Sequence, residues 1–89
     1  MNKEVIIIGA GGHGKVIADI VRRCGDTPLG FLDDGEALPP EIAGIPLLGK
    51  VSDYAKYPDA FFVIGIGSSS VREALAQRLC GVRWYTAIH

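Results

Sequence analysis

The 89-residue sequence predicts an α/β fold: a small, Rossmann-like, doubly wound and mostly parallel sheet of the βαβαβ type. Strand-like and helix-like segments alternate along the whole chain. Two strongly apolar segments, 4–9 and 60–67, are typical of strands that are buried on both faces of a parallel sheet. A glycine-rich turn joins the first run to an amphipathic helix. We therefore expect residues 1–89 to form one domain.

The first half of the chain predicts a strand, a helix and a second strand. Residues 4–9 (EVIIIG) form the first strand. The stretch 14–24 is predicted to be a helix, because its apolar residues recur at helical spacing. The apolar face of this helix is formed by Val16, Ile17, Ile20, Val21 and Cys24. Gly25 is expected to end this helix in the left-handed backbone conformation. Residues 28–34 (PLGFLDD) form a second strand that ends in two acids.

The middle of the chain carries weaker signals. Residues 35–44 are predicted to be a loop, because two adjacent prolines disfavour both helix and ladder hydrogen bonds. Residues 45–49 (IPLLG) are expected to form a short strand. A short helix is expected over 52–57, capped by Ser52 or Asp53.

The last third predicts a strand, a helix and a final strand. Residues 60–67 (AFFVIGIG) are the best candidate for another central strand. In the segment that follows, Ser70 and Glu73 have the spacing of a capping box. One apolar face of this helix is formed by Val71, Leu75 and Leu79. Gly81 is expected to end the helix, and 82–88 to form the last strand.

Composition narrows the classes of function. A net charge of −1 offers no electrostatic basis for binding nucleic acid or a membrane surface, so we expect neither partner. No apolar run approaches the roughly 20 residues of a membrane-spanning helix. The two cysteines, Cys24 and Cys80, each precede a glycine, which favours helix ends and packing roles over a disulfide or metal site. The absence of a disulfide framework favours a cytoplasmic setting.

The stretch 6–16 (IIIGAGGHGKV) is compatible with more than one phosphate-binding loop. A P-loop requires Ser or Thr after its lysine to bind magnesium, and here Val16 follows Lys15. Gly9, Gly11 and Gly14 match the dinucleotide fingerprint, but a complete dinucleotide site needs two βαβαβ halves. This chain is long enough for little more than one.

A mononucleotide-type site needs only half of a doubly wound sheet. Its ligand would lie above the carboxyl ends of the strands, where the loops 10–14, 33–35 and 67–70 are expected to converge. The first loop offers backbone N–H groups and His13 at a helix N-terminus, which favour phosphate. One of the two acids in the second loop would accept a hydrogen bond from a sugar hydroxyl. Arg72 is a candidate contact for a phosphate or a base.

These segments resemble a known family. The stretches IIIGAGGHGKVIADIV, GFLDD, GIPLLG and FFVIGIGSSSVR, followed by a strand leading to IH, are similar to the N-terminal domain of bacterial sugar O-acyltransferases. That family includes sialic acid O-acetyltransferases and the N-acetyltransferases of UDP-4-amino-sugars. The resemblance covers the whole chain in order. The pairing of G-x-G-G-H-x-K with F-L-D-D makes it specific.

The resemblance implies a nucleotide-sugar-binding domain followed by a left-handed β-helix of hexapeptide repeats. In the family that second domain forms homotrimers, binds acetyl-CoA as acyl donor and carries the catalytic histidine. No catalytic residue, cofactor or metal is therefore expected in this chain. Carried over by position, the contacts to a UDP-sugar would be Gly11, Gly12, His13, Asp33, Asp34, Gly67, Ser68, Ser69 and Arg72.

The expected function is therefore substrate binding in a sugar O- or N-acetyltransferase. Because no hexapeptide repeat occurs up to His89, we expect the chain to be a fragment of the acetyltransferase. Ser68 and Ser69 stand where the family usually has an acidic or amide residue, which leaves the acceptor sugar open. Two alternatives are a stand-alone nucleotide-binding regulatory module and an NAD-binding half-domain of an oxidoreductase.

Overall fold

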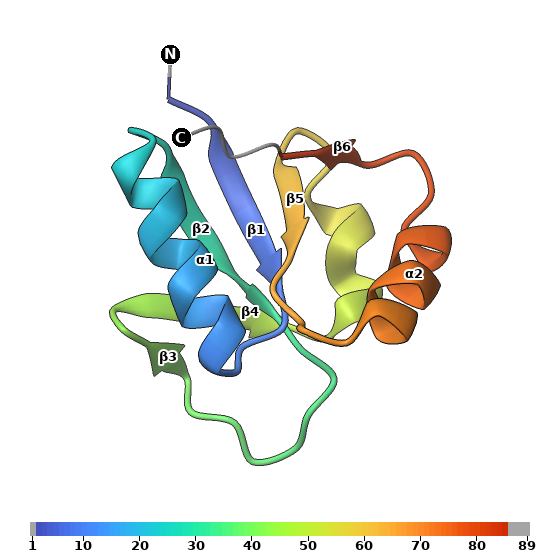
Figure 1. Cartoon of the computed structure of the whole chain (residues 1–89). Coiled ribbons are helices and arrows are strands. Elements are labelled where there is room, and N and C mark those ends of the chain that lie inside the picture. Colours follow the sequence, from blue (N-terminus) through green and yellow to red (C-terminus); the bar gives the residue numbers. More distant parts are fainter. Residues whose placement is uncertain (1, 86–89) are drawn as a thin grey trace.

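The computed structural model describes residues 2–85 and confirms the predicted α/β fold with a mostly parallel sheet. Within these residues six strands lie in the order β3-β4-β2-β1-β5-β6 (Figure 1). All neighbouring pairs are parallel except β3 and β4. The elements are β1 Glu4–Ile8, α1 Gly12–Arg23, β2 Thr27–Leu32, β3 Glu41–Ile42, β4 Ile45–Gly49, the 3-10 helix η1 Val51–Lys56, β5 Phe61–Ile64, α2 Ser69–Arg78 and β6 Arg83–Trp84.

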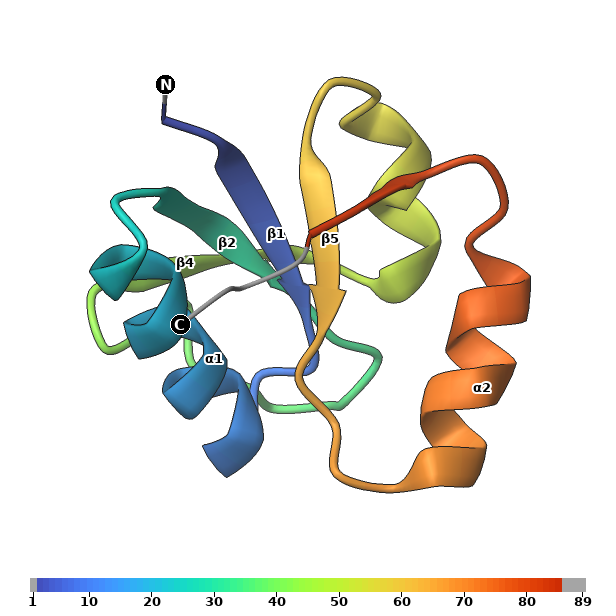
Figure 2. The same cartoon turned by 45° about the horizontal axis from the view of Figure 1, so that its top comes forward.

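The central strand β1 is buried on both faces, as its run of β-branched residues predicts. Ile6 and Ile8 point to one face, where they pack in a cluster with side chains from η1 and from α2 and its C-terminus. Ile7 points to the other face and packs in a cluster with Ala18 of α1. Successive side chains of a strand alternate between faces, so β1 serves both layers. The helices accordingly cover opposite faces of the sheet (Figures 1 and 2).

The chain changes direction across the sheet at β1. From β1 it passes through α1 to β2 and on to β4, and then returns through η1 to β5 on the other side of β1. The topological switch point therefore lies between the carboxyl ends of β1 and β5. Ligands of open α/β sheets bind at such a point, because the loops diverge and leave a crevice.

Several local predictions were wrong. The expected loop 35–44 contains β3, because Pro40 still offers a carbonyl and accepts a hydrogen bond of 2.8 Å from the Leu47 N–H. The second α-helix begins at Ser69, so Ser68 and not Ser70 occupies the N-cap. Ser68 makes no capping hydrogen bond, and its hydroxyl lies 3.2 Å from that of Ser70.

The predicted helix at 52–57 is a 3-10 helix that begins at Val51. Neither expected cap is the N-cap, which is Lys50. Asp53 instead reaches back to accept a hydrogen bond of 3.1 Å from the Lys50 backbone N–H. The Val51 N–H donates to the side chain of Asp34 from the loop after β2, so this helix start is held by a distant residue that a local pattern does not reveal.

Two helix faces are less buried than their patterns predict. Val16 of α1 is 59% exposed and Val71 of α2 is 43% exposed, whereas Leu75 and Leu79 are buried as expected.

Both predicted glycine stops are confirmed, since Gly25 and Gly81 follow the helices with φ of +81° and +77°. The packing prediction is wrong for Cys80, which is exposed, while Cys24 is half-buried. Of the strand predicted at 82–88, β6 confirms only Arg83–Trp84, and 86–88 lie outside the described residues.

A candidate nucleotide-binding site at the switch point

The three glycines of the first turn have different physical roles. Gly9 has a φ of +104°, which only glycine adopts readily, and it turns the chain out of β1. A side chain at Gly14 would overlap the carbonyl oxygen of Gly9, so this glycine lets α1 approach the strand closely. Around Gly11 and Gly12 nothing lies within 4 Å of an added methyl group. The turn is therefore open where a phosphate would meet the helix N-terminus.

Asp33 joins the loop after β2 to the glycine turn. Its Oδ2 accepts a hydrogen bond of 2.7 Å from the Ala10 N–H, and its Oδ1 accepts one of 2.7 Å from the Gly35 N–H. The first two predicted loops thus converge, as expected from parallel strands that end at the same edge. The carboxylate therefore holds the two loops together beside the N-terminus of α1.

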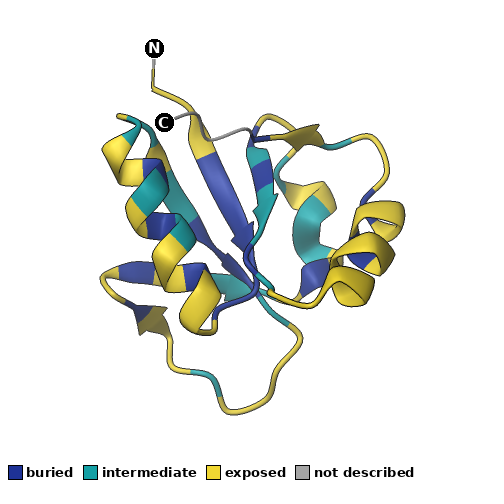
Figure 3. Ribbon diagram, in the orientation of Figure 1, coloured by how far each residue is buried: buried dark blue, intermediate teal, exposed yellow. Residues whose placement is uncertain are grey.

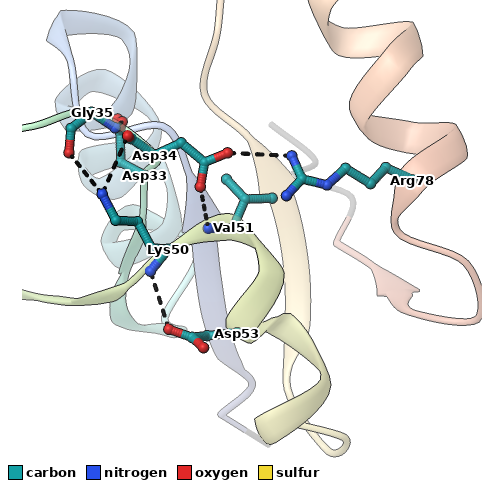
Figure 4. Close-up of polar contacts among 7 residues, drawn as sticks. All are labelled: Asp33, Asp34, Gly35, Lys50, Val51, Asp53 and Arg78. Carbon is teal, nitrogen blue, oxygen red and sulfur yellow. Dashed lines mark hydrogen bonds and ion pairs between the residues drawn. The ribbon is translucent and has the colours of Figure 1, made fainter.

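Asp34 has a different set of partners, shown in Figure 4. Its Oδ1 accepts a hydrogen bond of 2.9 Å from the Val51 N–H, and its Oδ2 lies 3.2 Å from the Arg78 guanidinium. The Val51 N–H, and after it Arg78, hold the pKa of the Asp34 carboxyl below its usual value. The Lys50 ammonium donates to the backbone carbonyls of Asp34 and Gly35, at 3.4 Å each.

His13 and Gly67 bring the loop after β5 to the glycine turn. A methyl group on Gly67 would lie 3.1 Å from Nε2 of His13, so the imidazole is packed against the bare backbone of this glycine. His13 itself is exposed, in the first turn of α1. The imidazole therefore spans the switch point from the end of β1 to the end of β5.

A cavity of about 200 Å³ opens beside these loops. Its walls are mostly apolar, and it is lined by Ile8, Gly9, Leu32, Asp33, Asp34, Val51, Ile66, Val71 and Leu75. Such a cavity matches a flat ring with few polar groups better than a charged phosphate. A wider groove of about 460 Å³ is also lined by Asp33 and extends along the loop after β2 to Lys50.

Not all of the predicted contacts meet at one place. The glycine turn, His13, Gly67 and the two aspartates surround the switch point. Ser69 and Arg72 instead line a separate cavity of about 300 Å³, together with Ile64, because they lie on another side of α2. Ser68 is exposed at the helix start.

Sequence reasoning missed two cations at this edge of the sheet. Lys50 follows the carboxyl end of β4, so the rule that parallel strands end together was enough to identify it. Arg78 had no such signal, because its contact with Asp34 depends on how the far end of α2 is placed. Among residues 2–85, no group of three His, Cys, Asp or Glu side chains is placed to hold a metal ion.

No helix in the described part of the chain is both long and apolar enough to cross a membrane. Cys24 and Cys80 form no disulfide within residues 2–85. The loops that follow the parallel strands β1, β2 and β5 meet at this edge of the sheet, beside the cavity of about 200 Å³.

Comparison with known proteins gives the same family as the motifs. Residues 4–79 match the family described as PglD N-terminal domain. A Bacillus subtilis (strain 168) protein named UDP-N-acetylbacillosamine N-acetyltransferase is 40% identical over 83 residues, which cover 86% of this chain and 38% of that protein. The uncharacterized protein L142 of Acanthamoeba polyphaga mimivirus is 32% identical, over 94% of this chain and 17% of its own length.

A solved structure shares the fold. The acetyltransferase domain of PglB from Neisseria gonorrhoeae FA1090, in complex with acetyl coenzyme A, superposes with a TM-score of 0.79 at 26% identity. The match covers 92% of this chain and 42% of that one, so the chain spans less than half the length of each of these three proteins. The resemblance seen in the motifs is confirmed, and the chain belongs to the family of PglD N-terminal domains.

Proposed function

We propose that this chain is the substrate-binding domain of a sugar O- or N-acetyltransferase and holds a UDP-linked amino-sugar. One observation carries the proposal: Asp33 lines the apolar cavity and also accepts a hydrogen bond from the open glycine turn. The diphosphate would lie at the N-terminus of α1, where N–H groups and the helix dipole favour negative charge. The uracil ring would enter the cavity.

Two comparisons support this ligand. One relative is named as an acetyltransferase of a UDP-linked sugar, and the solved structure with the same fold holds acetyl coenzyme A. In our proposal acetyl-CoA and the catalytic residues belong to a part of the protein beyond this chain. That part would also form a homotrimer. This chain would contribute by fixing the orientation of the acceptor, which can supply a large share of a rate enhancement.

We place the intact protein in the cytoplasm. The two thiols within residues 2–85 form no disulfide, which is consistent with a reducing compartment. The net charge of −1 gives no reason to expect nucleic acid as a partner.

Calorimetric titration of the 89-residue chain tests the ligand. UDP and a UDP-amino-sugar should bind, whereas NAD and ATP–magnesium should not. Binding of NAD alone would contradict the assignment and favour an oxidoreductase half-domain. Binding of ATP–magnesium alone would support a P-loop.

Two variants test the residues. His13→Ala and Asp34→Ala should each weaken UDP-sugar binding by about tenfold or more, because hydrogen bonds that involve a charged group, here the diphosphate or the Asp34 carboxylate, contribute roughly 1.5–3 kcal/mol each. Asp19→Ala is the matched control, since Asp19 pairs with Arg23 at 3.0 Å on the exposed side of α1. Unchanged affinity in both variants, with intact circular dichroism, would remove these residues from the site.

A further inference from the structure

The helix α2 is attached to the sheet by few side chains. Most of the helix is exposed (Figure 3). Leu75 is its one buried residue, and Leu79 is buried just after its end. In α1, by contrast, Gly14, Ala18 and Val21 are all buried. Because burial of apolar surface is what holds a helix on a sheet, α2 is held more weakly than α1.

Cavities lie on several sides of α2. The proposed base cavity, of about 200 Å³, lies against Val71 and Leu75. The cavity lined by Arg72 and Ile64 lies on another side of the helix. A third, of about 280 Å³, lies past the helix end between 80–82 and two tyrosines, Tyr54 of η1 and Tyr57 just after it. Because protein interiors are close-packed where no such cavities occur, these three leave α2 room to shift.

Besides the buried Leu79, one ion pair within residues 2–85 attaches the far end of α2. Arg78 Nη1 lies 3.2 Å from Asp34 Oδ2, and the two side chains are 46% and 52% exposed (Figure 4). Exposed pairs of this kind contribute little, so this one can open and close at small cost. Because Asp34 also accepts from the Val51 N–H, the pair links α2 to the opposite wall of the cavity.

The chain on each side of α2 contains glycine. Gly67 precedes the helix, and Gly81, with a φ of +77°, follows it. Glycine tolerates changes in φ and ψ that other residues resist, and hinges are formed by a few residues at the ends of moving elements. Both ends of α2 can therefore adjust while the sheet stays fixed.

We propose that α2 is a hinged clamp that closes on the base cavity when a nucleotide enters, with the Arg78–Asp34 pair as its latch. This inference rests on the proposed function, because the nucleotide is what α2 closes on. Closure buries the exposed part of Val71, which is 43% accessible in this structure, against the bound ring. The Arg78–Asp34 pair, which is already formed in this structure, then keeps the loop after β2, η1 and α2 around the ligand.

Hydrogen exchange of the 89-residue chain, measured by NMR, tests the latch without ligand. Amides of 72–79 should exchange faster than those of 16–23 in α1. Arg78→Gln should speed exchange in α2 a further two- to fivefold, about the amount that an exposed ion pair contributes, and leave α1 unchanged. Arg23→Gln removes the matched exposed pair of α1 and should leave α2 unchanged.

The same experiment with UDP tests closure. At about 100 times the dissociation constant, UDP should slow exchange in α2 by about tenfold or more. If UDP binds by calorimetry but α2 exchange does not slow, the clamp is wrong and the proposed function stands. If the amides of α2 exchange as slowly as those of α1, and Arg78→Gln does not change their rate of exchange, the latch is wrong. If UDP does not bind at all, both the proposed function and the nucleotide clamp fail.

Discussion

Gly14 illustrates how one small residue positions the whole candidate site. Its missing side chain lets α1 lie directly on the turn that leaves β1, with the Phe31 ring 3.2 Å from where a methyl group would be. Gly12, two residues earlier, faces open space. The same motif thus contains a glycine required by packing and a glycine that only leaves room for a ligand.

The glycine pair allows a matched test of stability. Gly14→Ala should lower the free energy of unfolding by about 1–3 kcal/mol or more, because the added methyl group overlaps the backbone of Gly9. Gly12→Ala should leave it unchanged or raise it by up to about 1 kcal/mol, since alanine suits a helical residue. Urea denaturation measures both. Equal effects of the two substitutions would show that close packing at Gly14 is not what the motif requires.

At the scale of elements, some parts of the fold were predictable from local signals. The β-branched run of β1 and the glycines after it predict a buried strand and a turn, because those patterns act over a few neighbouring residues. The rule that parallel strands end at the same edge of the sheet identified Asp33 and Asp34. The short strand β3 was missed, because its two residues follow prolines and are paired only once β4 is in place. The start of α2 was misplaced because residues 68–70 are three consecutive serines, and each is a favourable N-cap residue.

The cavity of the candidate site was predictable only in part. Its carboxylates come from strand ends, but Val71 and Leu75 reach it through the packing of α2 against the sheet. The latch between Asp34 and Arg78 joins residues 44 positions apart. Contacts of this range depend on the tertiary arrangement and leave no periodic signal in the sequence.

Tyr85 ties the last described segment to the turn between α1 and β2. Its hydroxyl donates a hydrogen bond of 2.6 Å to Asp26 Oδ2, and the same carboxylate accepts from the Lys3 N–H. Burial, and after it the bond to Asp26, raises the pKa of the Tyr85 hydroxyl. The fold therefore favours the neutral tyrosine.

Tyr85→Phe should lower the urea midpoint at neutral pH, because Asp26 loses its hydroxyl donor. The raised pKa also fixes the direction of a pH effect. The contribution of Tyr85 is complete below the ordinary tyrosine value of 10.0 and is lost as pH rises above it. Wild-type stability should thus fall more steeply than that of Tyr85→Phe between about pH 10 and pH 11.5. Parallel alkaline profiles would show that the hydrogen bond is not linked to folding.

At the scale of the whole molecule, the domain combines a firmly packed half with an adaptable one. Its Cα radius of gyration is 11.8 Å, close to the roughly 12 Å expected of a compact chain of this length. The sheet from β4 to β5 and the helix α1 make up the well-packed part. Three of the four cavities described above lie beside α2 or its C-terminal end. A ligand that fills the base cavity should therefore stabilise the whole domain, since a small domain has a thin margin of stability.

Thermal unfolding with increasing UDP measures this coupling. A ligand that binds only the folded chain adds about 2.7 kcal/mol at 100 times its dissociation constant, which for a domain of this size raises the melting temperature by roughly 10–20 °C. The melting temperature should rise with the logarithm of UDP concentration, and NAD at the same concentrations should leave it unchanged. In His13→Ala the same rise should need about tenfold more UDP, because the imidazole at the switch point no longer contacts the ligand. Equal rises with UDP and NAD would mean that the cavity recognises a nucleotide without selecting uridine, and no rise with either would contradict a nucleotide site at this edge of the sheet.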